Sequence, residues 1–195
     1  MMKKLVLYSV ILMMSQCNKY DDTQQAASLQ VPPLTETGAN TFGCLVNGDV
    51  WANFGETFLY EDLGGQLEPN MVRSGFYADT AGDSTFFIRG TYTLSKQGTV
   101  LKETSLSLSV PKKGNFVGIH QLIAGKGQCQ YQDILHYYSY YNQVRNSIIV
   151  IIKKDSITPG LHHVVSGTFS GMLYGAYGTA DSLRIVGGVF DTLTQ

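Results

Sequence analysis

The sequence predicts an all-β protein, either an antiparallel β-sandwich or a closed β-barrel of about ten strands. The chain has 21 glycines and 12 tyrosines but only 15% charged residues, a composition typical of tight turns between aromatic and β-branched strands. Several segments alternate apolar and polar residues with a period of two, most clearly at 104–110, where leucines and a valine alternate with serines. Helix signals are nearly absent.

Residues 1–16 predict a lipoprotein signal peptide. Lys3 and Lys4 precede an apolar run that stops before Cys17, which is the pattern of a secretory leader. The run has about half of the ~20 residues that a membrane span needs. The tetrapeptide MSQC at 14–17 resembles a lipobox, so we expect a diacylglycerol thioether and palmitate-type acylation at Cys17. An ordinary leader that contains a cysteine is the alternative.

Residues 17–31 are expected to form the lipidated cysteine and a flexible tether, because they are polar and show no apolar period. Lys19, Asp21 and Asp22 follow Cys17 closely and resemble the export signal of Bacteroidota lipoproteins. We therefore expect a lipid-anchored protein of the outer membrane, displayed on the cell surface in preference to the periplasm. A merely soluble acidic linker is the alternative.

Residues 32–195 are expected to form a single β domain. Pro32 and Pro33 mark its start, since proline fixes φ and biases the preceding residue away from helix. Asn47-Gly48 separates two apolar segments and predicts a hairpin with a type I′ turn. Further strands are predicted at 71–78, 84–94, 104–110, 147–153, 164–173 and 183–190, with 148–152 buried on both faces.

Cys44 and Cys129 remain after the lipidated cysteine is set aside. In an oxidising compartment such a pair tends to form a disulfide, so we expect a Cys44–Cys129 bridge. Two buried free thiols are the alternative.

Three stretches of the domain carry a resemblance to a known family. They read PPLTETGANTFGCLVNGDVW at 32–51, VSGTFS at 165–170 and DSLRIVGGVFD at 181–191. Together they resemble a family of uncharacterised Bacteroidota lipoproteins with a domain of unknown function. Val189 departs from this pattern, which has a polar residue there. The resemblance implies an envelope address and a β architecture, and it supplies no catalytic residues.

Charge and motifs exclude several classes of function. The formal net charge is −1 and no Lys/Arg cluster exceeds two residues, so nucleic acid is not an expected partner. The chain has no Gly-x-Ser-x-Gly elbow, His-Glu-x-x-His, phosphate loop or Cys-x-x-Cys, and nothing implies a cofactor. His162 and His163 are neighbours on a strand and point to opposite faces, so they do not predict a metal site.

The segment 131–142 is the one weak candidate for ligand binding. Tyrosine rings pack on the apolar face of a sugar, while carboxylate and amide groups bond its hydroxyls. On a strand, however, alternate tyrosines face opposite sides, so some of them are expected to pack in the core. The candidate residues are Asp133, His136, Tyr137, Tyr138, Tyr140 and Tyr141.

The sequence thus favours a non-catalytic binding or interaction module, anchored in the membrane by its lipid, whose ligand is a glycan or an envelope protein. Two other functions stay open: an envelope hydrolase with an unmarked active site, and a purely structural envelope lipoprotein.

Overall fold

The computed structural model describes residues 21–59, 66–78, 83–122, 124, 127–142, 148–160, 162–176 and 181–194. One curled sheet of 11 strands dominates it and forms a half-barrel. Its named strand pairs are antiparallel, which confirms the predicted all-β class. A separate two-stranded sheet consists of β3 and β4.

The elements are α2 (Thr23–Ala27), β1 (Thr41–Val46), β2 (Asp49–Ala52), β3 (Glu56–Leu59), β4 (Gln66–Pro69), β5 (Arg73–Ala78), β6 (Ser84–Lys96), β7 (Thr99–Lys112), β8 (Gly118–Leu122), β9 (Gln128–Asp133), β10 (Tyr138–Tyr141), β11 (Ile148–Ile157), β12 (His163–Gly175) and β13 (Ser182–Leu193).

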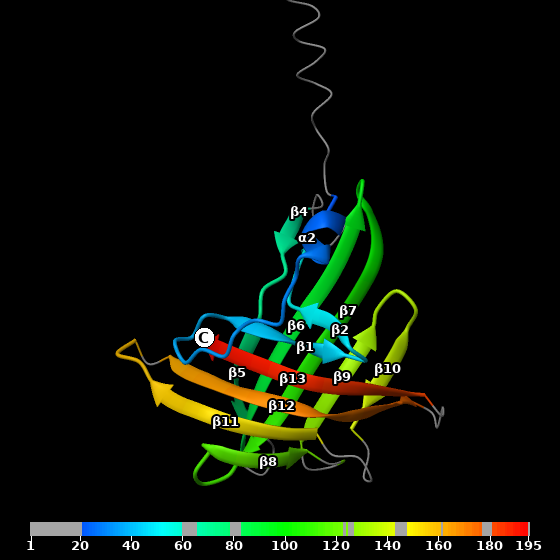
Figure 1. Cartoon of the computed structure of the whole chain (residues 1–195). Coiled ribbons are helices and arrows are strands. Elements are labelled where there is room, and N and C mark those ends of the chain that lie inside the picture. The colour runs from blue at the N-terminus through cyan, green and yellow to red at the C-terminus, as the bar shows by residue number, and fades with distance from the viewer. Residues whose placement is uncertain are drawn as a thin grey trace, which may run out of the picture.

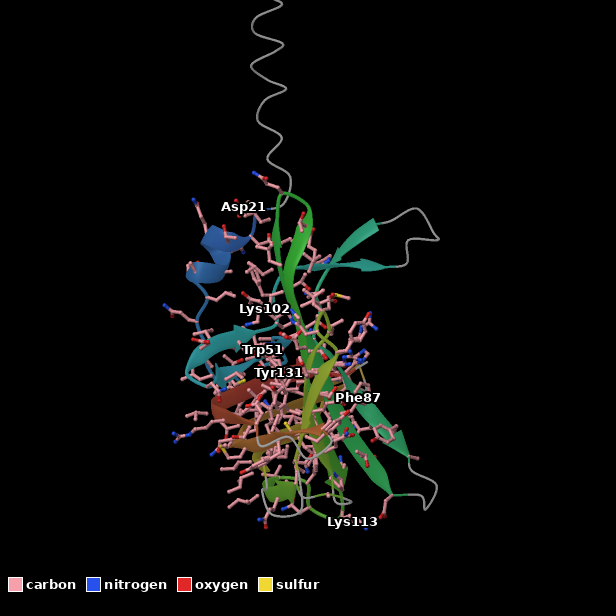
Figure 2. All side chains as sticks on the ribbon, turned by 90° about the vertical axis from the view of Figure 1, so that its right-hand side faces the viewer. Asp21, Trp51, Phe87, Lys102, Lys113 and Tyr131 are labelled. Atoms are coloured by element: carbon pink, nitrogen blue, oxygen red, sulfur yellow. The ribbon has the colours of Figure 1, made fainter. Side chains whose placement is uncertain are left out.

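The sheet curls into two layers that cross at a steep angle (Figure 1). The front layer holds β2, β1, β13, β12, β11 and β8, and the back layer holds β5, β6, β7, β9 and β10. The layers join where β10 pairs with β12, at Tyr140↔Gly175 and Tyr141↔Tyr174. In Figure 2 the side chains between the layers include Tyr131, whereas Phe87 lies on the opposite face of the back layer.

The predicted alternation in β7 is confirmed for residues 106–110, whereas Ser105, expected on the solvent face, is buried. Leu106, Leu108 and Val110 are fully buried between the layers, while Ser107 and Ser109 are only half-buried on the opposite face. The prediction that β11 is buried on both faces is wrong, because Ile149 on its outward face is 44% exposed. Only one layer covers this strand, so one of its faces meets solvent.

The predicted hairpin between β1 and β2 is confirmed. Asn47 and Gly48 have φ values of 52° and 95°, as a type I′ turn requires at both central positions. The Asn47 side-chain oxygen also accepts a hydrogen bond of 2.8 Å from the backbone N–H of Arg184. The turn is therefore tied to the neighbouring strand β13.

A buried carboxylate holds the segment before β1 onto the last strand. Asp191 on β13 is 0% exposed. It accepts hydrogen bonds from the backbone N–H groups of Thr37 (3.0 Å), Gly38 (2.9 Å) and Ala39 (3.0 Å) and from the hydroxyls of Thr35 and Thr37. Burial alone would raise the pKa of Asp191, but these hydrogen bonds outweigh it and hold the pKa below 3.8.

Part of the segment assigned to the tether carries structure that its sequence pattern does not predict. Asp21 forms an antiparallel bridge with Lys96 of β6, and the backbone N–H of Asp22 donates to the carbonyl of Ser95 at 3.0 Å. The short helix α2 follows and lies beside β6 (Figure 1). Within the described residues, no helix is both long enough and apolar enough to span a bilayer.

The predicted disulfide is wrong. Cys44 and Cys129 are free and fully buried, and their sulfurs are not at bonding distance. Cys44 lies on β1 in the front layer and Cys129 on β9 in the back layer. Packed sheets are about 10 Å apart, while a disulfide needs Cα atoms roughly 4.4–6.8 Å apart. Burial raises the pKa of Cys44 to about 12 and that of Cys129 well above 9.0.

Replacing the buried carboxylate tests its role. We expect Asp191→Asn to lower the free energy of unfolding by roughly 2 to 4 kcal/mol. The amide lacks the negative charge, and its own N–H donors would face the backbone N–H donors of residues 37–39. Urea unfolding followed by tryptophan fluorescence measures this change. The matched control is Asp49→Asn at an exposed position of β2, with an expected change within about 0.5 kcal/mol. Equal effects of the two substitutions would contradict the stated role.

The free thiols give a second prediction. In a Cys17→Ser protein at pH 8, we expect Cys44 and Cys129 to resist iodoacetamide while the protein is folded, because their thiolates are disfavoured by burial. Both should react in urea without prior reduction, as intact-mass spectrometry would show. A mass that rises only after addition of a reductant would mean that the two cysteines are bridged.

Candidate functional site

Serines and glutamines form facing rows on the outward face of the back layer. Because Leu108 pairs with Cys129 in the core, the residues on either side of each point outward. Ser107 pairs with Gln130 and Ser109 with Gln128. A strand surface of hydroxyls and amides is thus held at fixed spacing by the sheet.

This polar face leads into a pocket of about 1020 Å³. We call it the outer pocket. Its volume is at the upper end of the range typical of small-molecule sites, roughly 300–1,000 Å³. Strands β5 to β10 all contribute to its lining. The polar and aromatic residues of the lining include Tyr77, Ser109, His120, Gln121, Gln128 and Tyr141.

Hydrogen bonds along β9 and β10 position Tyr141 at the outer pocket. The next residue, Asn142, is 5% exposed, and its side-chain oxygen accepts a bond of 2.7 Å from the backbone N–H of Cys129. The Asn142 N–H in turn donates to the Cys129 carbonyl at 3.2 Å. The side chain of Gln130 donates to the Tyr141 hydroxyl, also at 3.2 Å. The ring therefore has a defined place on the outward face.

The ionisable groups of the pocket have partners. Lys113 and Asp83 form an ion pair at 2.5 Å. His120 Nε2 lies 2.7 Å from the carbonyl oxygen of Phe116. Because a carbonyl only accepts hydrogen bonds, this nitrogen carries a proton. Apart from the Lys113–Asp83 pair, the pocket offers mainly hydroxyl, amide and imidazole groups.

The structure divides the six predicted ligand residues among three places. Asp133 and His136 pair at 2.9 Å at the β9–β10 turn. Tyr137 there is 91% exposed with φ 58°, an uncommon conformation for a bulky residue, and Tyr138 is 63% exposed. Tyr141 lines the outer pocket.

Tyr140 has a structural role instead. Its ring packs against Tyr131 with centroids 6.3 Å apart, and its hydroxyl donates to Asp181 at 2.8 Å. This hydrogen bond, with burial and nearby carboxylates, raises the pKa of Tyr140 to about 12. The predicted cluster is therefore not one site.

Sequence reasoning missed most of the pocket. Tyr77, His120 and Gln128 come from three separate strands, β5, β8 and β9, which do not pair with one another, so no local motif connects them. The alternation of apolar and polar residues around Ser109 predicted a polar face on that strand. It did not predict which residues of neighbouring strands lie beside this face.

The structure keeps the neighbouring histidines apart. His162 Nδ1 lies 3.0 Å from the carbonyl oxygen of Thr194, whereas His163 Nδ1 lies 2.8 Å from a carboxylate oxygen of Asp155. Among the residues that the structure describes, no three His, Cys, Asp or Glu side chains are grouped as metal ligands.

A charged cluster closes one end of the core. Asp155 accepts hydrogen bonds from His163 at 2.8 Å and from Lys112 at 2.6 Å. The Lys112 ammonium lies 4.5 Å from the ring centroid of Phe76. The ring centroids of His163 and Phe76 are 4.8 Å apart. Burial alone would raise the pKa of Asp155, but the hydrogen bonds from His163 and Lys112 hold it below 3.8.

A histidine oriented by a carboxylate is also part of many hydrolase sites. A nucleophile would then contact His163 Nε2, the nitrogen opposite the Asp155 contact. Within the described part of the chain, no hydroxyl or thiol makes that hydrogen bond. The cluster is better explained as an ion pair that seals the core beside Phe76.

Comparisons of the chain with protein-family models, with curated proteins and with solved structures find no match. Function is therefore inferred from the geometry of the outer pocket.

The sealing cluster predicts a pH-dependent contribution to stability. Since the folded-state pKa of Asp155 is lowered from 3.8, its ion pair with Lys112 and its hydrogen bond with His163 stabilise the fold above that pH. This contribution is lost as the pH falls through the folded-state value. We expect Asp155→Asn to cost about 1 to 3 kcal/mol at pH 7. The difference from the unmodified protein should shrink below pH 3.8.

The matched control is Asp133→Asn, which breaks an Asp–His pair whose histidine side chain is 67% exposed. Its cost should stay below about 1 kcal/mol. Urea titrations at several pH values measure both variants. A cost of Asp155→Asn that does not change between pH 7 and pH 3 would contradict the assignment.

Proposed function

We propose that the protein is an outer-membrane lipoprotein, anchored through Cys17, that binds a neutral polyhydroxylated ligand such as a glycan in the outer pocket. In this proposal it acts as a non-catalytic binding module on the cell surface, and the family of Bacteroidota lipoproteins that it resembles is its natural relative. The observation that carries the proposal is the lining of the pocket by hydroxyls, amides and tyrosines.

The lining chemistry supports a sugar over a charged metabolite. Ser109 and Gln128 present hydroxyl and amide groups side by side, which both donate and accept hydrogen bonds. Tyr77 and Tyr141 add aromatic rings that suit the apolar face of a pyranose. The ion pair of Lys113 with Asp83 reduces the attraction for a net charge.

The same lining argues against the alternative of a glycosidase. Glycosidases use two carboxyl groups separated by about 5–9 Å. Asp83 is the one acidic residue among the described lining residues, and it is paired with Lys113. A partner protein of the envelope is the second candidate ligand, and the exposed Tyr137 and Tyr138 at the β9–β10 turn favour it.

The glycan proposal is tested with an array of neutral bacterial, plant and host oligosaccharides, followed by calorimetry on each hit. We expect Tyr141→Ala to weaken binding by about tenfold, because a stacked ring and a fixed hydroxyl are lost. Gln128→Ala should also weaken it. The control is Tyr138→Ala, which removes an exposed ring from the same strand outside the pocket.

Retention of full affinity by both pocket variants would refute the site. Binding to no glycan on the array would refute the ligand class. Loss of affinity in Tyr138→Ala alone would move the binding site to the β9–β10 turn.

A further inference from the structure

The part of the chain that the structure describes begins very close in sequence to the proposed lipid anchor. Asp21, in its bridge with Lys96, lies four residues after Cys17. An extended chain spans at most about 3.6 Å per residue, so the Cα atoms of Cys17 and Asp21 are at most about 14 Å apart.

The contact at Asp21 is reinforced by its neighbours. The backbone N–H of Asp22 donates to Ser95 on β6. The Asp21 carboxylate accepts hydrogen bonds from the backbone N–H of Thr23, at 3.1 Å, and from the Thr23 hydroxyl. Thr23 begins α2, which lies beside β6 (Figure 1). The chain is thus fixed to β6 from its first described residue onward.

The fixed point lies at one extreme of the domain. Strand β7 has 14 residues and is therefore about 45 Å long. Figure 2 shows Asp21 at one end of the molecule and Lys113, which follows β7, at the other. A connection of about 14 Å therefore keeps the Asp21 end near the membrane, whereas it leaves the Lys113 end free to stand about 45 Å away.

We propose that the lipoprotein stands on the membrane with the tip of the β6–β7 hairpin against the lipid headgroups. We call this surface the hairpin end; it comprises residues 95–102. The inference rests on the proposed anchor at Cys17, and its partner is the phospholipid surface itself.

The side chains of the hairpin end suit a lipid interface. Lys96 is exposed, and lysine extends its apolar stem along such an interface while its ammonium meets phosphate. Lys102 is also exposed, but its ammonium lies 5.7 Å from the ring centroid of Tyr92. Leu101 is 49% exposed. It is the extra residue of a β-bulge, because Lys102 pairs with Leu94 and Val100 with Ser95. Asp21 and Asp22 offset the lysine charge, so the acyl chains supply the affinity and the hairpin end sets the orientation.

This orientation presents the outer pocket to the outside. Ser109 in its lining lies ten residues along β7 from Thr99, a separation of about 33 Å. The pocket therefore opens far from the headgroups, where a large extracellular glycan has access.

The test uses the full acylated protein in vesicles of phosphatidylethanolamine and phosphatidylglycerol with a nitroxide-labelled headgroup lipid. Thr99→Cys and Asn115→Cys each place an environment-sensitive fluorophore at an exposed position near opposite ends of the domain. We expect quenching at residue 99 to exceed quenching at residue 115 several-fold. Equal quenching at both positions, or stronger quenching at residue 115, would overturn the inference.

A control isolates the short connection. A Gly-Ser linker of about 20 residues after Cys17 adds an r.m.s. reach of roughly 25 Å, and it should reduce the quenching at residue 99. Persistent quenching there would contradict the role of the short connection, because the hairpin end would then bind lipid on its own.

Intact-mass spectrometry of the same preparations separates the two proposals. Absence of acyl mass on Cys17 would refute the anchor and the orientation together. Acylated protein with uniform quenching would refute the orientation alone.

Discussion

The carboxylate of Asp191 is the constraint on which the placement of the N-terminal segment depends. A buried carboxylate without a cation is costly unless hydrogen bonds replace its hydration. Here three backbone N–H groups and two hydroxyls, all from residues 35–39, serve this purpose. Because Asp191 also pairs with Thr41, the same residue sets the register of the first strand on the last. The path from β1 back to α2, and so to β6, starts from this point.

The back layer has an apolar face toward the core and a polar face outward, because successive residues of a strand point to opposite sides. Leu108 and Cys129 face the core, and their neighbours Ser109 and Gln128 face outward. Residues that pack in the core and residues that face the pocket therefore alternate along each strand. A substitution on the outward face leaves the core contacts intact. The charged cluster around Asp155 lies at the end of the core, and its role is to seal rather than to bind.

The sequence allowed those features to be predicted that depend on local backbone geometry. The turn at Asn47-Gly48 and the buried face of β7 follow from positive φ and from period two. Alternation also placed Cys44 in the core, but it could not tell which layer Cys129 would join, and so the disulfide prediction failed. In the same way, the tyrosines at 137–141 are adjacent in sequence, yet a turn and a strand send them to three environments. The outer pocket depends on pairing between distant strands, and no local pattern encodes that pairing.

The seam between the layers gives Tyr141 a further significance. Among the described residues, β10 joins β12 through only two pairs, Tyr140↔Gly175 and Tyr141↔Tyr174. Within the described residues, every other pair of neighbouring strands in the large sheet has more paired residues than this seam. Tyr141 also lines the outer pocket, so a molecule bound there would contact this seam. A ligand bound in the outer pocket would add contacts beside the line of the half-barrel that has the fewest strand pairs.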